Sequence, residues 1–99
     1  YELWLAPEDH APDVRDADPA TLGTALRRAL VAVKTATAGA PVNLWIHTAP
    51  ARLRGPFHWH VEIAPRLSGI AGFELGSDIA IVNTDPTAAA ATLRAALSV

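Results

Sequence analysis

Strict alternation of apolar and polar residues between Phe57 and Ile63 predicts a half-buried β-strand. Because successive side chains of a strand point to opposite faces, the apolar and polar residues of this segment separate completely. The apolar face carries Phe57, Trp59, Val61 and Ile63, and the polar face carries His58, His60 and Glu62. Two imidazoles and a carboxylate on one face indicate a metal site, a proton-transfer site or a nucleophile.

Shorter alternating segments predict further strands. Residues 1–7 place Leu3 and Leu5 on one face and Trp4 on the other, and residues 42–47 separate Leu44 and Ile46 from Asn43, Trp45 and His47. Residues 69–75 and 78–82 predict two more short strands around a hairpin-like turn at Gly76-Ser77.

Two Asp-Pro pairs predict helix starts, with aspartate as the N-cap and proline in the first turn. The first helix follows Asp18-Pro19 and ends before Gly39 and Pro41. Its apolar positions recur at spacings of three and four: Leu22, Ala25, Leu26, Ala29, Leu30 and Val33. The second helix follows Asp85-Pro86 and runs through Ala89, Leu93 and Leu97.

The expected order is therefore β-α-β-β-β-β-α, an α+β fold in one domain spanning residues 1–99. We expect the helices to cover the sheet face formed by Leu44, Ile46, Phe57, Trp59, Val61 and Ile63. The opposite face then stays open and presents Trp45, His47, His58, His60 and Glu62.

Composition argues against several classes of function and of binding site. A net charge of −2 and scattered basic residues argue against a nucleic-acid partner. The chain has no cysteine, hence no disulfide or Cys-based zinc site, and no apolar run that predicts a membrane span. The cytoplasm is the default expectation. The chain contains no methionine and begins at Tyr1, so we expect a fragment of a longer protein.

The open face allows several chemistries. His47, His60 and Glu62 supply two nitrogens and an oxygen from neighbouring strands, a donor set that Zn²⁺ or Fe²⁺ accepts. Alternatively, they are hydrogen-bonded polar residues at an interface, or His60 is a nucleophile that attacks phosphorus. Elsewhere, Phe73 and Glu74 suit contact with a sugar or are ordinary strand residues, and His10 is expected to be solvated.

Three motifs carry a family resemblance. The runs Asn43-Leu-Trp-Ile-His-Thr-Ala-Pro50, Phe57-His-Trp-His-Val-Glu-Ile-Ala-Pro65 and Ala71-Gly-Phe-Glu-Leu75 resemble the C-terminal domain of galactose-1-phosphate uridylyltransferase. That enzyme belongs to the histidine-triad superfamily, contains two copies of the fold, and exchanges uridylyl groups between UDP-glucose and galactose 1-phosphate. Its nucleophile lies in a His-Pro-His motif of the N-terminal copy, and this chain has no such motif.

The resemblance implies supporting roles for this chain. It implies a structural zinc or iron site at His47, His60 and Glu62, where Glu62 replaces the usual histidine, with a fourth ligand from an absent N-terminal catalytic domain. It also implies a homodimer in which Phe73 and Glu74 contact the hexose of UDP-hexose or hexose 1-phosphate. Asn83 lies near a polar position of the family that contacts the phosphate–sugar region of these substrates, so it is the third candidate. The alternatives are a stand-alone histidine-triad hydrolase or phosphorylase with His60 as nucleophile, and a non-enzymatic, metal-stabilised dimerisation module.

Overall fold

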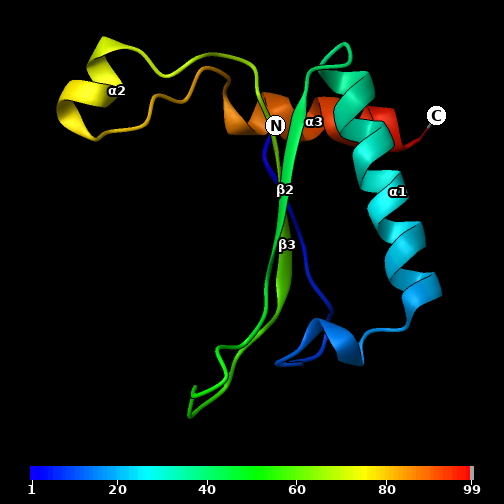
Figure 1. Cartoon of the computed structure of the whole chain (residues 1–99). Coiled ribbons are helices and arrows are strands. Elements are labelled where there is room, and N and C mark those ends of the chain that lie inside the picture. The colour runs from blue at the N-terminus through cyan, green and yellow to red at the C-terminus, as the bar shows by residue number, and fades with distance from the viewer. Residues whose placement is uncertain (99) are drawn as a thin grey trace.

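A three-stranded antiparallel sheet and two long helices form the body of the molecule in the computed structural model, which describes residues 1–98 (Figure 1). The elements in chain order are β1 (Leu3–Leu5), the 3-10 helix η1 (Val14–Asp16), α1 (Pro19–Ala36), β2 (Val42–His47), β3 (His60–Pro65), α2 (Gly72–Ser77) and α3 (Pro86–Leu97). The sheet order is β1-β3-β2, so β3 is its central strand. The predicted α+β class is confirmed.

The register of the sheet fixes which side chains share a face. Ile63 of β3 lies opposite Leu3 of β1 and Leu44 of β2, and Glu62 lies opposite Trp4 and Trp45. Cross-strand partners project to the same side. The rows therefore alternate between an apolar face and a face that carries tryptophan, histidine and glutamate, as the alternating sequence predicts.

The core lies between the apolar face and the two long helices. Val33 of α1, Leu93 of α3 and the strand residues Val61 and Ile63 are all at most 4% exposed, together with Trp59, which precedes β3. Figure 1 shows α1 along one side of the sheet and α3 crossing the upper end of the strands towards α1. The predicted stripe of α1 is confirmed, because Leu22, Leu26, Ala29 and Leu30 pack against this core.

Both predicted helix starts are confirmed by their caps. The Asp18 carboxylate accepts a hydrogen bond of 2.8 Å from the Thr21 backbone N–H, and Asp85 accepts one of 2.9 Å from Ala88. Each cap satisfies a backbone donor that the first helical turn leaves free. After α1, Gly39 has φ +82°, a left-handed conformation that only glycine adopts without strain.

The two strands predicted at residues 69–75 and 78–82 are wrong. Gly72–Ser77 forms the short helix α2, and residues 78–82 form no regular element. Local hydrogen bonds explain the helix: Glu74 accepts from the Ala71 N–H at 3.1 Å, and the Ser77 hydroxyl donates to the Phe73 carbonyl at 2.6 Å. Figure 1 shows α2 projecting away from the sheet, so this segment has no strand with which to pair.

The helices cover the apolar face incompletely. Val61 and Ile63 in β3 are at most 1% exposed, whereas Leu44 and Ile46 in β2 are 41% and 49% exposed. The expectation that all these residues are covered is therefore wrong for β2, because α1 and α3 pack over the β1 and β3 side. Within residues 1–98, no helix combines the length and apolar character that crossing a bilayer requires.

Candidate functional site

His47, His60 and Glu62 meet on the open face of the sheet. His47 ends β2, His60 begins β3 directly opposite it, and Glu62 follows on the same face of β3. One ligand atom from each residue lies within 4.8 Å of the other two. Glu62 Oε1 is 2.9 Å from His47 Nε2 and 3.4 Å from His60 Nε2. The three residues that sequence spacing selected are therefore brought together.

Neighbouring groups fix the tautomers of the two imidazoles. His60 Nδ1 lies 3.1 Å from the carbonyl oxygen of His58. A carbonyl only accepts, so we assign the proton to Nδ1, which leaves the Nε2 lone pair facing Glu62. The Trp45 indole N–H donates to His47 Nε2 at 2.8 Å, so this nitrogen is an acceptor as well.

Three electron-rich atoms therefore face one another, and a cation suits the space between them. Zn²⁺ with bonds of about 2.0–2.1 Å in tetrahedral geometry separates its ligand atoms by about 3.3 Å, which small side-chain shifts would achieve here. Two imidazoles and a carboxylate are also an accepted donor set for iron. The side chains of His60 and Glu62 are only 19% and 13% exposed. The residues fit a metal ion and leave a fourth position open.

Aromatic stacking holds the imidazoles in place. The ring of His60 is stacked between Trp4 on one side and His47 on the other, with centroid separations of 4.6 Å for both pairs. Sequence reasoning placed Trp4 on the face opposite Leu3 but missed this contact. The alternation of β1 gives the face of Trp4, whereas its position beside His60 follows from the register between β1 and β3.

His58 does not join the metal-ligating group. The regular strand begins at His60, and the His58 ring lies outside it, with Nε2 2.6 Å from the Pro7 carbonyl. The ring of His10 lies 4.9 Å from that of His58, centroid to centroid, although His10 is exposed as predicted. These two histidines connect the loop after β1 to the segment before β3.

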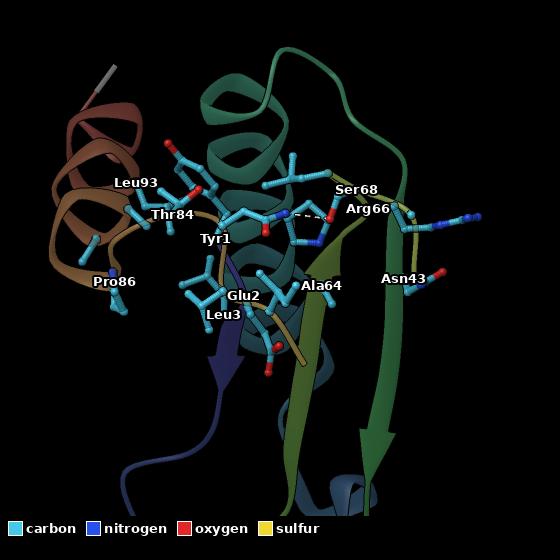
Figure 2. Close-up of a pocket in the computed structure, with 18 of the residues that line it drawn as sticks. Tyr1, Glu2, Leu3, Asn43, Ala64, Arg66, Ser68, Thr84, Pro86 and Leu93 are labelled. Carbon is cyan, nitrogen blue, oxygen red and sulfur yellow. Dashed lines mark hydrogen bonds between the residues drawn. The ribbon is translucent and has the colours of Figure 1, made fainter. Parts of the chain in front are cut away.

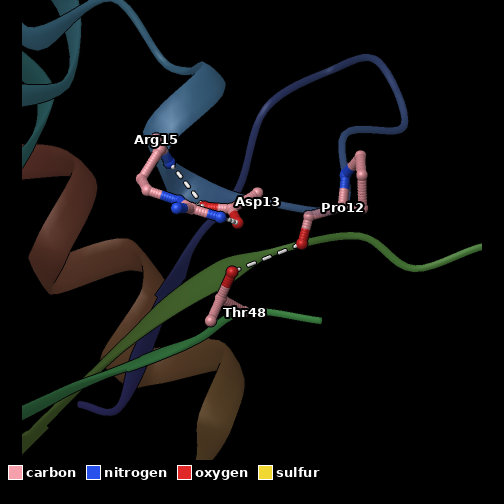
Figure 3. A network of polar contacts seen from close by, with 4 residues as sticks. All are labelled: Pro12, Asp13, Arg15 and Thr48. Carbon is pink, nitrogen blue, oxygen red and sulfur yellow. Dashed lines mark hydrogen bonds and ion pairs between the residues drawn. The ribbon is translucent and has the colours of Figure 1, made fainter. Parts of the chain in front are cut away.

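A polar network anchors the end of β2, which carries His47 (Figure 3). Thr48, next to His47, donates to the Pro12 carbonyl at 3.4 Å, and the Ala49 N–H donates to the same oxygen at 2.9 Å. The adjacent Asp13 forms an ion pair and hydrogen bonds with Arg15. The guanidinium of Arg15 lowers the pKa of Asp13 to about 2. The two hydrogen bonds to Pro12 hold the loop after β1 against the end of β2, and the Asp13–Arg15 pair fixes the conformation within that loop.

The predicted sugar-contacting residues occupy two places. Phe73 and Glu74 lie on the projecting helix α2, where Phe73 is 57% exposed. Asn83 lies at the base of this projection, where its amide donates to the Ser68 hydroxyl at 2.7 Å. Asn83 also lines a cavity of about 730 Å³ between Tyr1, Arg66 and α3 (Figure 2). Among the described residues, Phe73 and Glu74 do not belong to the lining of this cavity.

Known proteins resemble the chain over nearly its whole length. No model of a protein family matches it. An ADP-glucose phosphorylase from Arabidopsis thaliana is 32% identical over 101 residues, which are 95% of this chain and 29% of that protein. A crystal structure of an ADP-glucose phosphorylase from Arabidopsis thaliana with bound ADP-glucose superposes with a TM-score of 0.84 and 32% identity, over 94% of this chain and 32% of that one.

A uridylyltransferase mutant gives the same picture. Its structure superposes with a TM-score of 0.83 and 30% identity, over 98% of this chain and 36% of that one. The chain thus spans about a third of the length of these relatives. Nearly the whole chain therefore matches about one third of the length of each of these uridylyltransferase-like proteins. The chain has the histidine-triad-type fold of the matching part.

Proposed function

We propose that the chain is the C-terminal domain of a longer nucleotidyltransferase that exchanges a uridylyl group between UDP-glucose and galactose 1-phosphate. The chain-wide match to proteins of nucleotide-sugar metabolism carries this proposal. The relatives are about three times as long, and the sequence lacks a His-Pro-His motif. The nucleophile therefore belongs to the remainder of the enzyme, and this domain supplies support, hexose contacts and a dimer interface.

In this proposal His47, His60 and Glu62 bind a structural zinc or iron ion. The bound ion supplies a positive charge that links β2 to β3 and offsets the carboxylate of Glu62. His60 then positions the ion and is not a nucleophile. Its Nε2 faces Glu62 at 3.4 Å and its ring is stacked on both sides, which supports a structural role.

Metal analysis of the purified protein tests the site. We expect zinc or iron in a stoichiometric amount, and its loss in His47→Ala, because two remaining ligands hold the ion far more weakly. His10→Ala is the matched control, since His10 is an exposed histidine outside the group. Equal metal content in wild type and His47→Ala would remove the site from the proposal.

The projecting segment supplies the hexose contacts and the dimer interface in this proposal. Its apolar side chains are 51–76% exposed: Ile70, Phe73, Leu75, Ile79, Ile81 and Val82. Exposed apolar side chains gathered on one segment are typical of a surface that another protein covers. Glu74 uses Oε2 to cap α2, so Oε1 can accept a hydrogen bond from a sugar hydroxyl.

Steady-state kinetics of the full-length enzyme test these roles. Glu74→Gln is expected to raise the KM for hexose 1-phosphate about tenfold or more, because a hydrogen bond to a charged group is lost. Phe73→Ala is expected to raise it about two- to tenfold, because one stacked ring is lost. Leu75→Ala is the matched control because Leu75 is on the same helix and is 76% exposed. An equal effect of all three changes would show that the segment acts through dimerisation alone.

A nucleotide-sugar phosphorylase is the second candidate function. It is favoured by the match to ADP-glucose phosphorylase. In that reaction inorganic phosphate replaces the hexose phosphate as nucleotidyl acceptor, and the products are a nucleoside diphosphate and hexose 1-phosphate. Incubating the full-length enzyme with UDP-glucose or ADP-glucose, and with galactose 1-phosphate or phosphate, separates the candidates. UDP-galactose as the main product supports the transferase, and a nucleoside diphosphate supports the phosphorylase.

A stand-alone hydrolase with His60 as nucleophile predicts a different result. It requires a covalent nucleotidyl adduct on His60, formed by the 99-residue chain. The proposed transferase domain forms no such adduct, because the nucleophile of the proposed enzyme lies outside this chain. Intact-mass measurement after incubation with UDP-glucose distinguishes the two, and an adduct that disappears in His60→Ala would overturn the proposal.

A further inference from the structure

Trp45 contacts the metal-ligating group but is not one of its ligands. It lies two residues before His47 on the same face of β2, and its indole N–H donates to His47 Nε2 at 2.8 Å. Trp45 is 39% exposed. The indole is thus partly accessible to solvent, and Trp45 is not among the apolar residues that pack against the core.

The Trp45 hydrogen bond occupies the electrons that a metal ion needs. A neutral imidazole nitrogen without a proton has a single lone pair in the plane of the ring. That lone pair either accepts the indole proton or binds a cation. His47 Nε2 is also the atom that lies 2.9 Å from Glu62 Oε1, so it is the nitrogen directed at the proposed metal position.

We propose that Trp45 competes with a metal ion for the lone pair of His47 Nε2, so that metal binding and the Trp45–His47 hydrogen bond exclude each other. This inference rests on the proposed metal site. Without the ion, the positive indole proton of Trp45 lies beside the lone pair of His47 Nε2, which is close to the Glu62 carboxylate. When the ion binds, the indole releases His47 and turns to solvent. Trp45 thereby sets the metal affinity without being a ligand.

Trp4 provides a matched control on the same face. It is also an exposed tryptophan and stacks on His60, but its indole N–H donates to Glu2 at 3.1 Å. Trp4 therefore has an aromatic contact with a ligand and no hydrogen bond to one. A comparison of the two positions separates the effect of the donated proton from that of a nearby ring.

Zinc binding to the purified protein tests the inference. Trp45→Phe keeps an aromatic ring and removes the donor, so Zn²⁺ should bind about three- to tenfold more tightly, which corresponds to the net value of one neutral hydrogen bond. Trp4→Phe should leave the affinity unchanged within about twofold. Isothermal titration calorimetry at one fixed pH measures all three dissociation constants, with ZnCl₂ as the only ligand.

The wild-type protein gives a direct readout that needs no variant. The chain has three tryptophans, so its ¹H–¹⁵N spectrum contains three indole N–H resonances. We expect the Trp45 resonance to shift upfield on addition of Zn²⁺, as its hydrogen bond to nitrogen is lost, while the resonance of the buried Trp59 stays in place. This measurement decides the question even if Trp45→Phe folds poorly.

The outcomes distinguish this inference from the metal site itself. Zinc binding with an unmoved Trp45 resonance, or unchanged affinity in Trp45→Phe, overturns the inference and leaves the metal site standing. Zinc binding by Trp45→Phe alone supports the inference in its strongest form. The absence of binding in both proteins overturns the metal site and the inference together.

Discussion

Replacing Ile63 by alanine tests where the core of this domain lies. Ile63 is fully buried in the central strand, between Leu3 and Leu44 in the same cross-strand row. The substitution removes three carbon groups at about 0.8 kcal/mol each, or about 2.4 kcal/mol of transfer free energy. The cavity that remains adds to this cost, because a packed core relaxes only partly. We expect a loss of about 3–4 kcal/mol in the free energy of unfolding.

Leu44→Ala is the matched comparison in the neighbouring strand. It removes the same number of carbon groups from the same row of the same face, but Leu44 is 41% exposed and the change opens no closed cavity. We expect a loss of about 1 kcal/mol. Urea unfolding followed by circular dichroism measures both values, at two protein concentrations to detect self-association. Ile63→Val removes one carbon group and is expected to cost about 1 kcal/mol; it replaces Ile63→Ala if the latter does not fold, and the costs at the two positions are then compared per carbon group removed.

Equal costs for Leu44→Ala and Ile63→Ala at both concentrations would refute the reasoning, because they would mean that the isolated chain covers β2. A cost for Leu44→Ala that is small in the isolated domain and larger in the full-length protein would show that the rest of the enzyme covers this strand.

Three further predictions concern the caps and the anchoring network. The pKa of Asp13 is lowered from 3.8 to about 2, so its interaction with Arg15 stabilises the fold above about pH 4 and is lost as the pH falls towards 2. Asp13→Asn should therefore flatten the dependence of the free energy of unfolding on pH between these values. Asp85→Ala should lower the free energy of unfolding by about 1 kcal/mol through the lost cap to Ala88; a thermal melt identical to wild type would contradict that role. Gly39→Ala should cost about 1 kcal/mol through backbone strain at φ +82°, measured by urea unfolding, and no loss would show that the turn relaxes.

The sequence determined the local features of this protein. The period-two alternation around His60 assigned each side chain to a face, and the Asp-Pro pairs located both long helices. It also selected His47, His60 and Glu62 as a group, because two neighbouring strands with known faces leave few ways to arrange them. The faces and the helix starts depend on residues close together in the chain, where covalent geometry limits the alternatives, and the metal-ligating group needs only the pairing of two consecutive strands in addition.

The tertiary structure decided what depends on distant contacts. A strand needs a partner, and the sequence does not show that residues 69–82 project away from the sheet, where α2 forms through local hydrogen bonds instead. The uncovered apolar side of β2, the stacking of Trp4 on His60 and the hydrogen bond from Trp45 to His47 likewise follow from the register and side-chain packing. Alternation gives the face of a side chain, whereas its neighbours on that face are set only when remote segments of the chain come together.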